Sequence, residues 1–128
     1  MIHYNTQFLD KPITFIAVSH GKDYAISVMG GDKFHIGAIA ICIPGSVSSV
    51  SSVSGHKEEA LALQLASGIS CALNCVISVS MGIHFDNITA SQIDDLISIV
   101  NTLKDGFIDD CKKGSFSTTD FSIDILNT

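Results

Sequence analysis

The segment VISVSMGIHFDNITASQIDDLISIV, residues 76–100, decides the fold because it joins a strand pattern directly to a well-marked helix start. Its first half alternates apolar residues with serine and glycine, the period of two that a half-buried strand shows. The apolar side of this strand consists of Ile77, Val79, Met81 and Ile83. After the Asp86-Asn87 pair, the apolar residues recur at the 3.6-residue period of an amphipathic helix. The segment therefore predicts a protein that mixes strands and helices.

Two N-terminal signals mark the start of this helix. Thr89 and Gln92 have the T-x-x-Q spacing of a capping box, in which two side chains satisfy backbone N–H groups of the first turn. Ile88 and Ile93 occupy the two positions of a hydrophobic staple. We expect the helix to end between residues 106 and 114. Its apolar stripe comprises Ile93, Leu96, Ile97, Val100, Leu103 and Phe107.

Upstream of this segment, the chain has the pattern of strands joined by short turns. Residues 13–19 and 23–29 are rich in β-formers, and the intervening His20-Gly21-Lys22 predicts a hairpin. The run HIGAIAICIP, residues 35–44, is apolar on both faces, as expected of a strand in the middle of a sheet. Valine recurs at a period of three in SVSSVSSVS, residues 46–54, which predicts a bulged or edge strand.

The remaining patterns complete the fold prediction. Residues 56–74 carry apolar residues at helical spacings and predict a first amphipathic helix. The tail, residues 115–128, alternates Phe121, Ile123 and Ile125 with polar residues, which favours a late edge strand or a loose tail. We predict one α+β domain over residues 1–128, with a mostly antiparallel sheet of about five to six strands and two helices packed on one face.

Composition narrows the function classes. The net charge of −6, with only seven Lys and Arg residues, argues against nucleic-acid binding. No apolar run reaches the roughly 18–20 residues of a membrane span, and MIHYNTQFLDKP lacks the features of a signal peptide. We therefore expect a cytoplasmic protein that does not enter the membrane. A hydrophobic fraction of 46% with 16% charged residues suggests a homo-oligomer or a subunit.

The four cysteines form no CxxC pair and lie in apolar surroundings. Cysteine behaves as a small hydrophobic residue in such places. We therefore predict buried free thiols at Cys42, Cys71, Cys75 and Cys111.

Three glycine–histidine motifs stand at the boundaries of predicted elements. They are GGDKFHIGA at residues 30–38, GHKEE at residues 55–59 and GIHFDN at residues 82–87. Element boundaries are where a rigid scaffold presents functional groups. The three histidines, His35, His56 and His84, are therefore candidate site residues.

The GHKEE motif has two interpretations that the residues alone do not separate. In the first, Gly55, His56 and Lys57 form an anion site with the free N–H groups of the first helical turn. A bound phosphate would then offset cations that the helix dipole disfavours. In the second, Lys57 is a solvated surface residue, while Glu58 and Glu59 satisfy the helix dipole.

The GIHFDN motif also has two interpretations that the residues alone do not separate. Asp86 and Asn87 are typical of turn chemistry before a helix, or they line a pocket together with His84 and His56. A metal site would need His35, His56 and His84 with Asp86, but no short spacing fixes two ligands together, so we predict no metal. The serines lack a G-x-S-x-G element and no cysteine has a neighbouring histidine, so nucleophilic catalysis is not expected.

Taken in order, the three motifs resemble those of the prenylated flavin chaperone LpdD-like family. These are small D-subunit-like proteins of UbiD-type hydroxyarylic acid decarboxylases, and the resemblance covers roughly residues 11–107. The resemblance implies a fold similar to that of proteasome assembly chaperones, a homodimer, and a role in helping the partner decarboxylase acquire or mature its prenylated FMN. It implies that prenylated FMN or FMN is bound transiently.

By position, the resemblance implies cofactor-binding roles for Gly31, His35, Gly37, Gly55, His56, Lys57, Glu58, Gly82, His84, Asp86 and Asn87. Our leading hypothesis is a non-catalytic chaperone whose first helix start binds a phosphate. It predicts that His56 and Lys57 face the same cavity as His35 and His84. The alternatives are a purely structural homodimeric assembly chaperone or protein-interaction module without a ligand, and a small metal-dependent enzyme.

Overall fold

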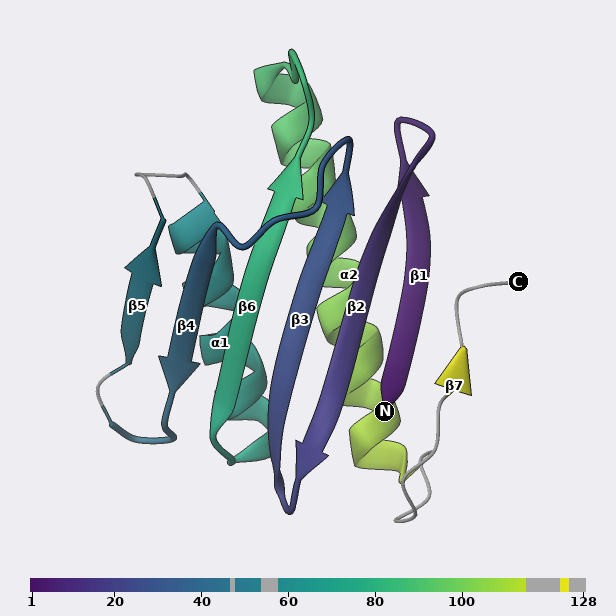
Figure 1. Cartoon of the computed structure of the whole chain (residues 1–128). Helices are drawn as coiled ribbons and strands as arrows, with labels where there is room; N and C mark the ends of the chain where they lie inside the picture. The colour runs from purple at the N-terminus through teal and green to yellow at the C-terminus, as the bar shows by residue number, and fades with distance from the viewer. Residues whose placement is uncertain (47, 54–57, 115–122, 125–128) are drawn as a thin grey trace.

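An antiparallel meander forms one half of the sheet in the computed structural model, which describes residues 1–46, 48–53, 58–114 and 123–124 (Figure 1). The meander consists of β1 (Ile2–Phe8), β2 (Lys11–His20) and β3 (Asp23–Gly31). His20 pairs with Asp23 across a turn in which Gly21 has a φ of 64°, a conformation that glycine adopts without strain. The predicted hairpin is confirmed, whereas β1 was not predicted.

The second half of the sheet joins this meander through a parallel pair. It contains β4 (Ala38–Cys42), β5 (Ser49–Ser52) and β6 (Ile77–His84), and the full order is β5-β4-β6-β3-β2-β1-β7. Among the strands that the structure describes, β3–β6 and the short β1–β7 pair are parallel and the other pairs are antiparallel. The prediction of a mostly antiparallel α+β fold is confirmed, with six strands and the two-residue β7 (Ile123–Asp124). Edge positions for β5 and β7 agree with the sequence patterns.

Both helices cover the same face of the sheet and lie behind it in Figure 1. The first, α1 (Glu58–Leu73), packs on β4 and β6, and the second, α2 (Ala90–Lys113), runs behind the meander. Phe107 of α2 is fully buried, with its ring centroid 5.3 Å from that of Phe15 and 5.1 Å from that of Tyr24. These aromatic contacts attach α2 to the meander.

Further contacts hold the C-terminal half of α2 against the strands. The hydroxyl of Tyr4 donates a 2.6 Å hydrogen bond to Oδ2 of Asp110. Burial, reinforced by this carboxylate, raises the pKa of Tyr4. Burial also raises the pKa of Tyr24 to about 12, with a smaller effect from neighbouring Cys111. Both phenols therefore stay neutral at ordinary pH.

The capping box is present as predicted. Oγ1 of Thr89 accepts a hydrogen bond from the backbone N–H of Gln92 at 3.1 Å, and Oε1 of Gln92 accepts one from the N–H of Thr89 at 3.0 Å. At the other end, Gly114 is the C-cap in the left-handed conformation, with a φ of 64°. The predicted end of the helix is therefore confirmed.

Replacing Thr89 with alanine should lower the free energy of unfolding by about 1 kcal/mol, because the backbone N–H of Gln92 in the first turn loses its side-chain acceptor. Urea denaturation measures this loss. The matched control is Thr102→Ala, where the hydroxyl only donates to the backbone oxygen of Ser98 within the helix. Its expected change is within about 0.5 kcal/mol. Equal losses in the two variants would contradict a capping role for Thr89.

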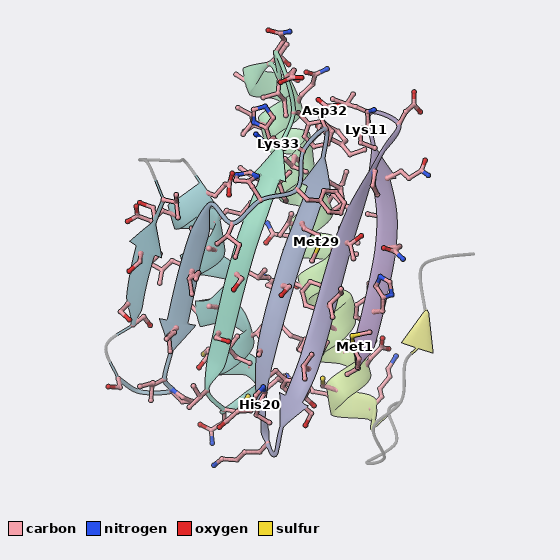
Figure 2. The ribbon with its side chains drawn as sticks, in the orientation of Figure 1. Met1, Lys11, His20, Met29, Asp32 and Lys33 are labelled. Atoms are coloured by element: carbon pink, nitrogen blue, oxygen red, sulfur yellow. The ribbon has the colours of Figure 1, made fainter. Side chains whose placement is uncertain are left out.

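The face of the sheet opposite the helices is open and carries small and polar side chains beside a few apolar ones (Figure 2). Ser27 and Ser80 lie side by side on it through the β3–β6 pairing. Next to them on β4, Ile39 and Ile41 are 41% and 43% exposed, because no helix covers this face. As predicted, β4 lies inside the sheet, but one of its two apolar faces meets solvent.

The cysteines are free thiols, but not all of them are buried. Cys42 and Cys75 are buried and Cys111 is partly buried, and burial raises the pKa of the Cys111 thiol to about 11. Cys71 is exposed on α1, so the prediction of a buried thiol was wrong at this position. Cys71 follows Ile69 by two positions, so it lies on the side of α1 away from the buried Leu65 and Ile69.

Candidate functional site

The first and third glycine–histidine motifs meet where β3 and β6 end. The parallel register places Gly31 opposite His84, and the N–H of Asp32 donates to the backbone oxygen of His84 at 2.7 Å. Farther along, the N–H of Gly37 donates to the backbone oxygen of Met81 at 2.8 Å. These two hydrogen bonds hold the connecting loop, residues 32–37, across the end of β6.

Close backbone approach explains two glycines of the motifs. A Cβ atom at Gly82 would overlap the backbone carbonyl of His35, and a Cβ atom at Gly37 would overlap the carboxylate of Glu58. At Gly82 the neighbour is backbone, so only glycine leaves room for the carbonyl of His35. At Gly37 the neighbour is the end of the Glu58 side chain, which glycine lets approach the loop closely.

His35 and Glu58 form the inner pair of the site. Nε2 of His35 lies 3.1 Å from Oε1 of Glu58, which is the first residue of α1, and the side chains are 22% and 14% exposed. Helix dipoles favour a carboxylate at this end. The other oxygen, Oε2, is buried and has no hydrogen-bond partner within the described part of the chain. Such an oxygen is costly to leave unpaired, and it lies against the backbone of Gly37.

His84 and Asp86 form an outer, more exposed pair. Nε2 of His84 lies 2.8 Å from Oδ1 of Asp86, and the ring centroids of His35 and His84 are 6.3 Å apart. The N–H of Asp86 donates to Oδ2 of Asp32 at 2.9 Å, and Nζ of Lys11 lies 3.7 Å from Oδ1 of Asp32. The two imidazoles are thus held as neighbours, each oriented by its own carboxylate.

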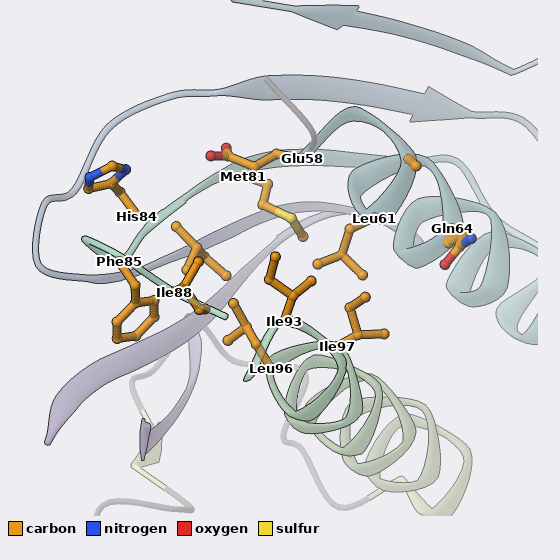
Figure 3. A pocket seen from close by; sticks show the side chains of 12 residues that line it. Glu58, Leu61, Gln64, Met81, His84, Phe85, Ile88, Ile93, Leu96 and Ile97 are labelled. Carbon is orange, nitrogen blue, oxygen red and sulfur yellow. The ribbon is translucent and has the colours of Figure 1, made fainter. Parts of the chain in front are cut away.

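An apolar pocket of about 510 Å³ opens beside these pairs, between the first turns of α1, the end of β6 and the first turns of α2 (Figure 3). Its volume lies in the range of small-molecule sites, about 300–1,000 Å³. Glu58, His84 and Gln64 are its polar members. The apolar lining consists of Ala60, Leu61, Met81, Ile83, Phe85, Ile88, Ile93, Leu96 and Ile97.

The structure brings together some of the predicted site residues. His35, Glu58, His84 and Asp86 form the two pairs described above, and Asn87 has a φ of 58° in the turn before α2. Gly55, His56 and Lys57 lie outside the described residues, so their predicted place at the cavity stays a prediction.

Sequence reasoning missed the pocket itself. Leu61, Ile93 and Ile97 line it, yet in the sequence they belong to the same apolar stripes as fully buried core residues. A periodic apolar pattern predicts which face turns inward, but it does not tell a filled contact from a hollow one. No signal in the sequence distinguishes these positions.

Within residues 1–46, 48–53, 58–114 and 123–124, no group of three or more His, Cys, Asp and Glu side chains is arranged to hold a metal ion. In the same part of the chain, no helix has the length and apolar character needed to cross a membrane.

Fold and site together define a small α+β protein with a ligand-sized apolar pocket bordered by histidine–carboxylate pairs. Residues 8–112 match the model of the family described as the prenylated flavin chaperone LpdD-like domain. The chain belongs to this family, as its three motifs predicted. A comparison with curated proteins found no match.

Proposed function

We propose that this protein is a non-catalytic chaperone that carries prenylated FMN and helps a UbiD-type decarboxylase acquire or mature it. Family membership supports the chaperone role and the association with prenylated flavin. One observation carries the assignment of the site. Glu58 and His84 line a single ligand-sized pocket, and His35, which pairs with Glu58, lies beside His84, so the pocket edge draws on all three glycine–histidine motifs.

The residues around the pocket suit a flavin mononucleotide. Such a molecule joins a flat, largely apolar ring system to a phosphate through a polar chain. The pocket offers apolar walls for the rings, while Glu58, Gln64 and His84 offer hydrogen-bonding groups. In this proposal the chain's own residues bind the flavin and shield it from solvent, and the decarboxylation itself takes place on the partner enzyme.

For the phosphate, we propose the segment that immediately precedes α1. Glu58 begins this helix, and the N–H groups of a first helical turn have no acceptor within the helix itself. Helix N-termini bind anions, and Gly55, His56 and Lys57 would add close approach and positive charge. This arrangement would explain two basic residues at a helix end that otherwise favours acids.

Titration with prenylated FMN, FMN and riboflavin tests the proposal, using calorimetry or flavin fluorescence. Lys57→Ala should weaken the binding of FMN by about tenfold, because a charged contact to phosphate is lost, and should leave the affinity for riboflavin unchanged. The matched control is Lys22→Ala, because Lys22 lies in the β2–β3 turn at the far end of the sheet. Absence of binding to every flavin at high micromolar concentration would contradict the proposed function.

We also propose a homodimer that docks on the decarboxylase subunit. The open sheet face, with Ile39 and Ile41 exposed beside small serines, supports contact with another protein. Light scattering during size-exclusion chromatography measures the mass of the particle. A monomer at every concentration tested would contradict the dimer, while the flavin titration remains an independent test.

A further inference from the structure

We infer that two copies of this chain pair through β5, antiparallel and about a two-fold axis at Val50, so that their sheets continue into one. This pairing rests on the homodimer of the proposed function and deepens it by naming the surface that the second copy occupies. It uses the edge of the sheet, so the open face with Ile39 and Ile41 remains available to the decarboxylase subunit.

The backbone of β5 offers hydrogen-bonding groups to a further strand. β5 is the last strand at one edge of the sheet and pairs with β4 on one side (Figure 1). The N–H of Val53 donates to the backbone oxygen of Gly37 at 2.8 Å, just before β4 begins. Because successive residues of a strand turn their backbone groups to opposite sides, Ser51 also faces β4, whereas Val50 and Ser52 face outward. Such outward groups are a template for another strand.

This edge lacks the devices that usually prevent pairing. Residues 36–55, which include β4 and β5, contain no Asp, Glu, Lys, Arg or His. Exposed edges are normally guarded by charges, by proline within the strand or by a bulge, and Pro44 lies in the turn after β4 instead. At the opposite edge, β7 already pairs with part of β1. In a chain of net charge −6, an uncharged edge also lets two copies approach without local repulsion.

The sequence around β5 suits pairing with itself. SVSSVSSVS, residues 46–54, reads the same in both directions and has Val50 at its centre. Antiparallel pairing about Val50 sets this residue against Val50 of the second copy, and Ser49 against Ser51 of the second copy. Val50 packs on the hydrophobic core of its own chain, so the facing valines extend that core across the axis. Each copy uses its β5 edge once, which closes the assembly at two chains.

Charge variants at Ser49 and Ser51 test both the edge and its register. Both positions are exposed, so a charge there is compatible with folding of the single chain. In S49K/S51K every new lysine faces another lysine across the axis, whereas in S49K/S51E every lysine faces a glutamate. Light scattering during size-exclusion chromatography should give the wild type twice the 13.6 kDa of one chain. Over a dilution series, S49K/S51K should dissociate about 30-fold more readily than S49K/S51E.

The matched control is Val18→Lys, which adds a charge at an exposed position of β2 on the open face. It should leave the dimer unchanged, because β4, β6 and β3 separate β2 from β5. If S49K/S51K lowers the thermal midpoint, S49E/S51E and S49E/S51K repeat the comparison with the charges reversed.

The outcomes separate this pairing from the proposed function. Equal dissociation of S49K/S51K and S49K/S51E, or dissociation in Val18→Lys alone, would overturn pairing through β5 and leave a homodimer formed by another surface. A wild-type protein that is monomeric at every concentration would overturn both the pairing and the homodimer. The flavin titration tests the chaperone role independently of either result.

Discussion

Replacing Gly82 with alanine should lower the free energy of unfolding by about 3 kcal/mol, one of the two largest losses that we expect from a single substitution. The new Cβ atom would overlap the backbone carbonyl of His35 and would lie 3.2 Å from the backbone nitrogen of Ile36. Backbone atoms cannot rotate away as a side chain can. The loop would have to lift from β6 and lose the hydrogen bond between Gly37 and Met81.

The Gly82→Ala variant should also lose flavin binding, because lifting the loop separates His35 from Glu58 and His84. Its matched control is Gly106→Ala. A Cβ atom there would meet nothing within 4 Å, and alanine is favoured over glycine inside a helix by about 1 kcal/mol. Urea denaturation of both variants measures the difference. A Gly82→Ala protein as stable as the wild type would show that the loop does not rest on β6.

Truncating Phe107 to alanine should lower the free energy of unfolding by about 3–5 kcal/mol, because this side chain is fully buried. Its ring lies against three others, with centroids 6.5 Å from Tyr4, 5.3 Å from Phe15 and 5.1 Å from Tyr24. Removing the ring leaves a cavity between α2 and the meander and takes away its contacts with the other three rings.

The same truncation at Phe34 provides the control for Phe107. This ring is 50% exposed on the connecting loop, and Phe34→Ala should change stability by no more than about 0.5 kcal/mol. Thermal or urea unfolding compares the two variants. A small effect at Phe107, similar to that at Phe34, would mean that α2 is not attached to the meander by this aromatic cluster.

Local signals in the sequence predicted most elements of the fold. Thr89 and Gln92 mark the start of α2, and the hairpin at Gly21 follows from turn chemistry, because both depend on residues only a few positions apart. The first strand was missed for the opposite reason. Its inward residues, Ile2 and Tyr4, are few, and its place depends on pairing with β2 along its whole length.

The candidate site was predictable only in part. The motifs contain His35, Glu58 and His84, but their meeting depends on the parallel pairing of β3 with β6, which no local pattern specifies. The pocket depends on packing between the first turns of α1 and α2. At Ile97 the helix pattern is that of an ordinary core residue, so its lining role appears only in three dimensions.

The parallel pairing of β3 with β6 also affects how the chain reaches its native state. Tyr24 pairs with Ile77, so closing this contact requires a long intervening segment to be ordered, while the meander forms from neighbours in sequence. His35 follows β3 and His84 ends β6, so the two histidines become neighbours only when these strands have paired. A growing chain therefore has no complete site until β6 and the first turns of α2 have left the ribosome. Under the proposed function, cofactor could be taken up only after synthesis of this region, and its binding would then favour the closed chain by mass action.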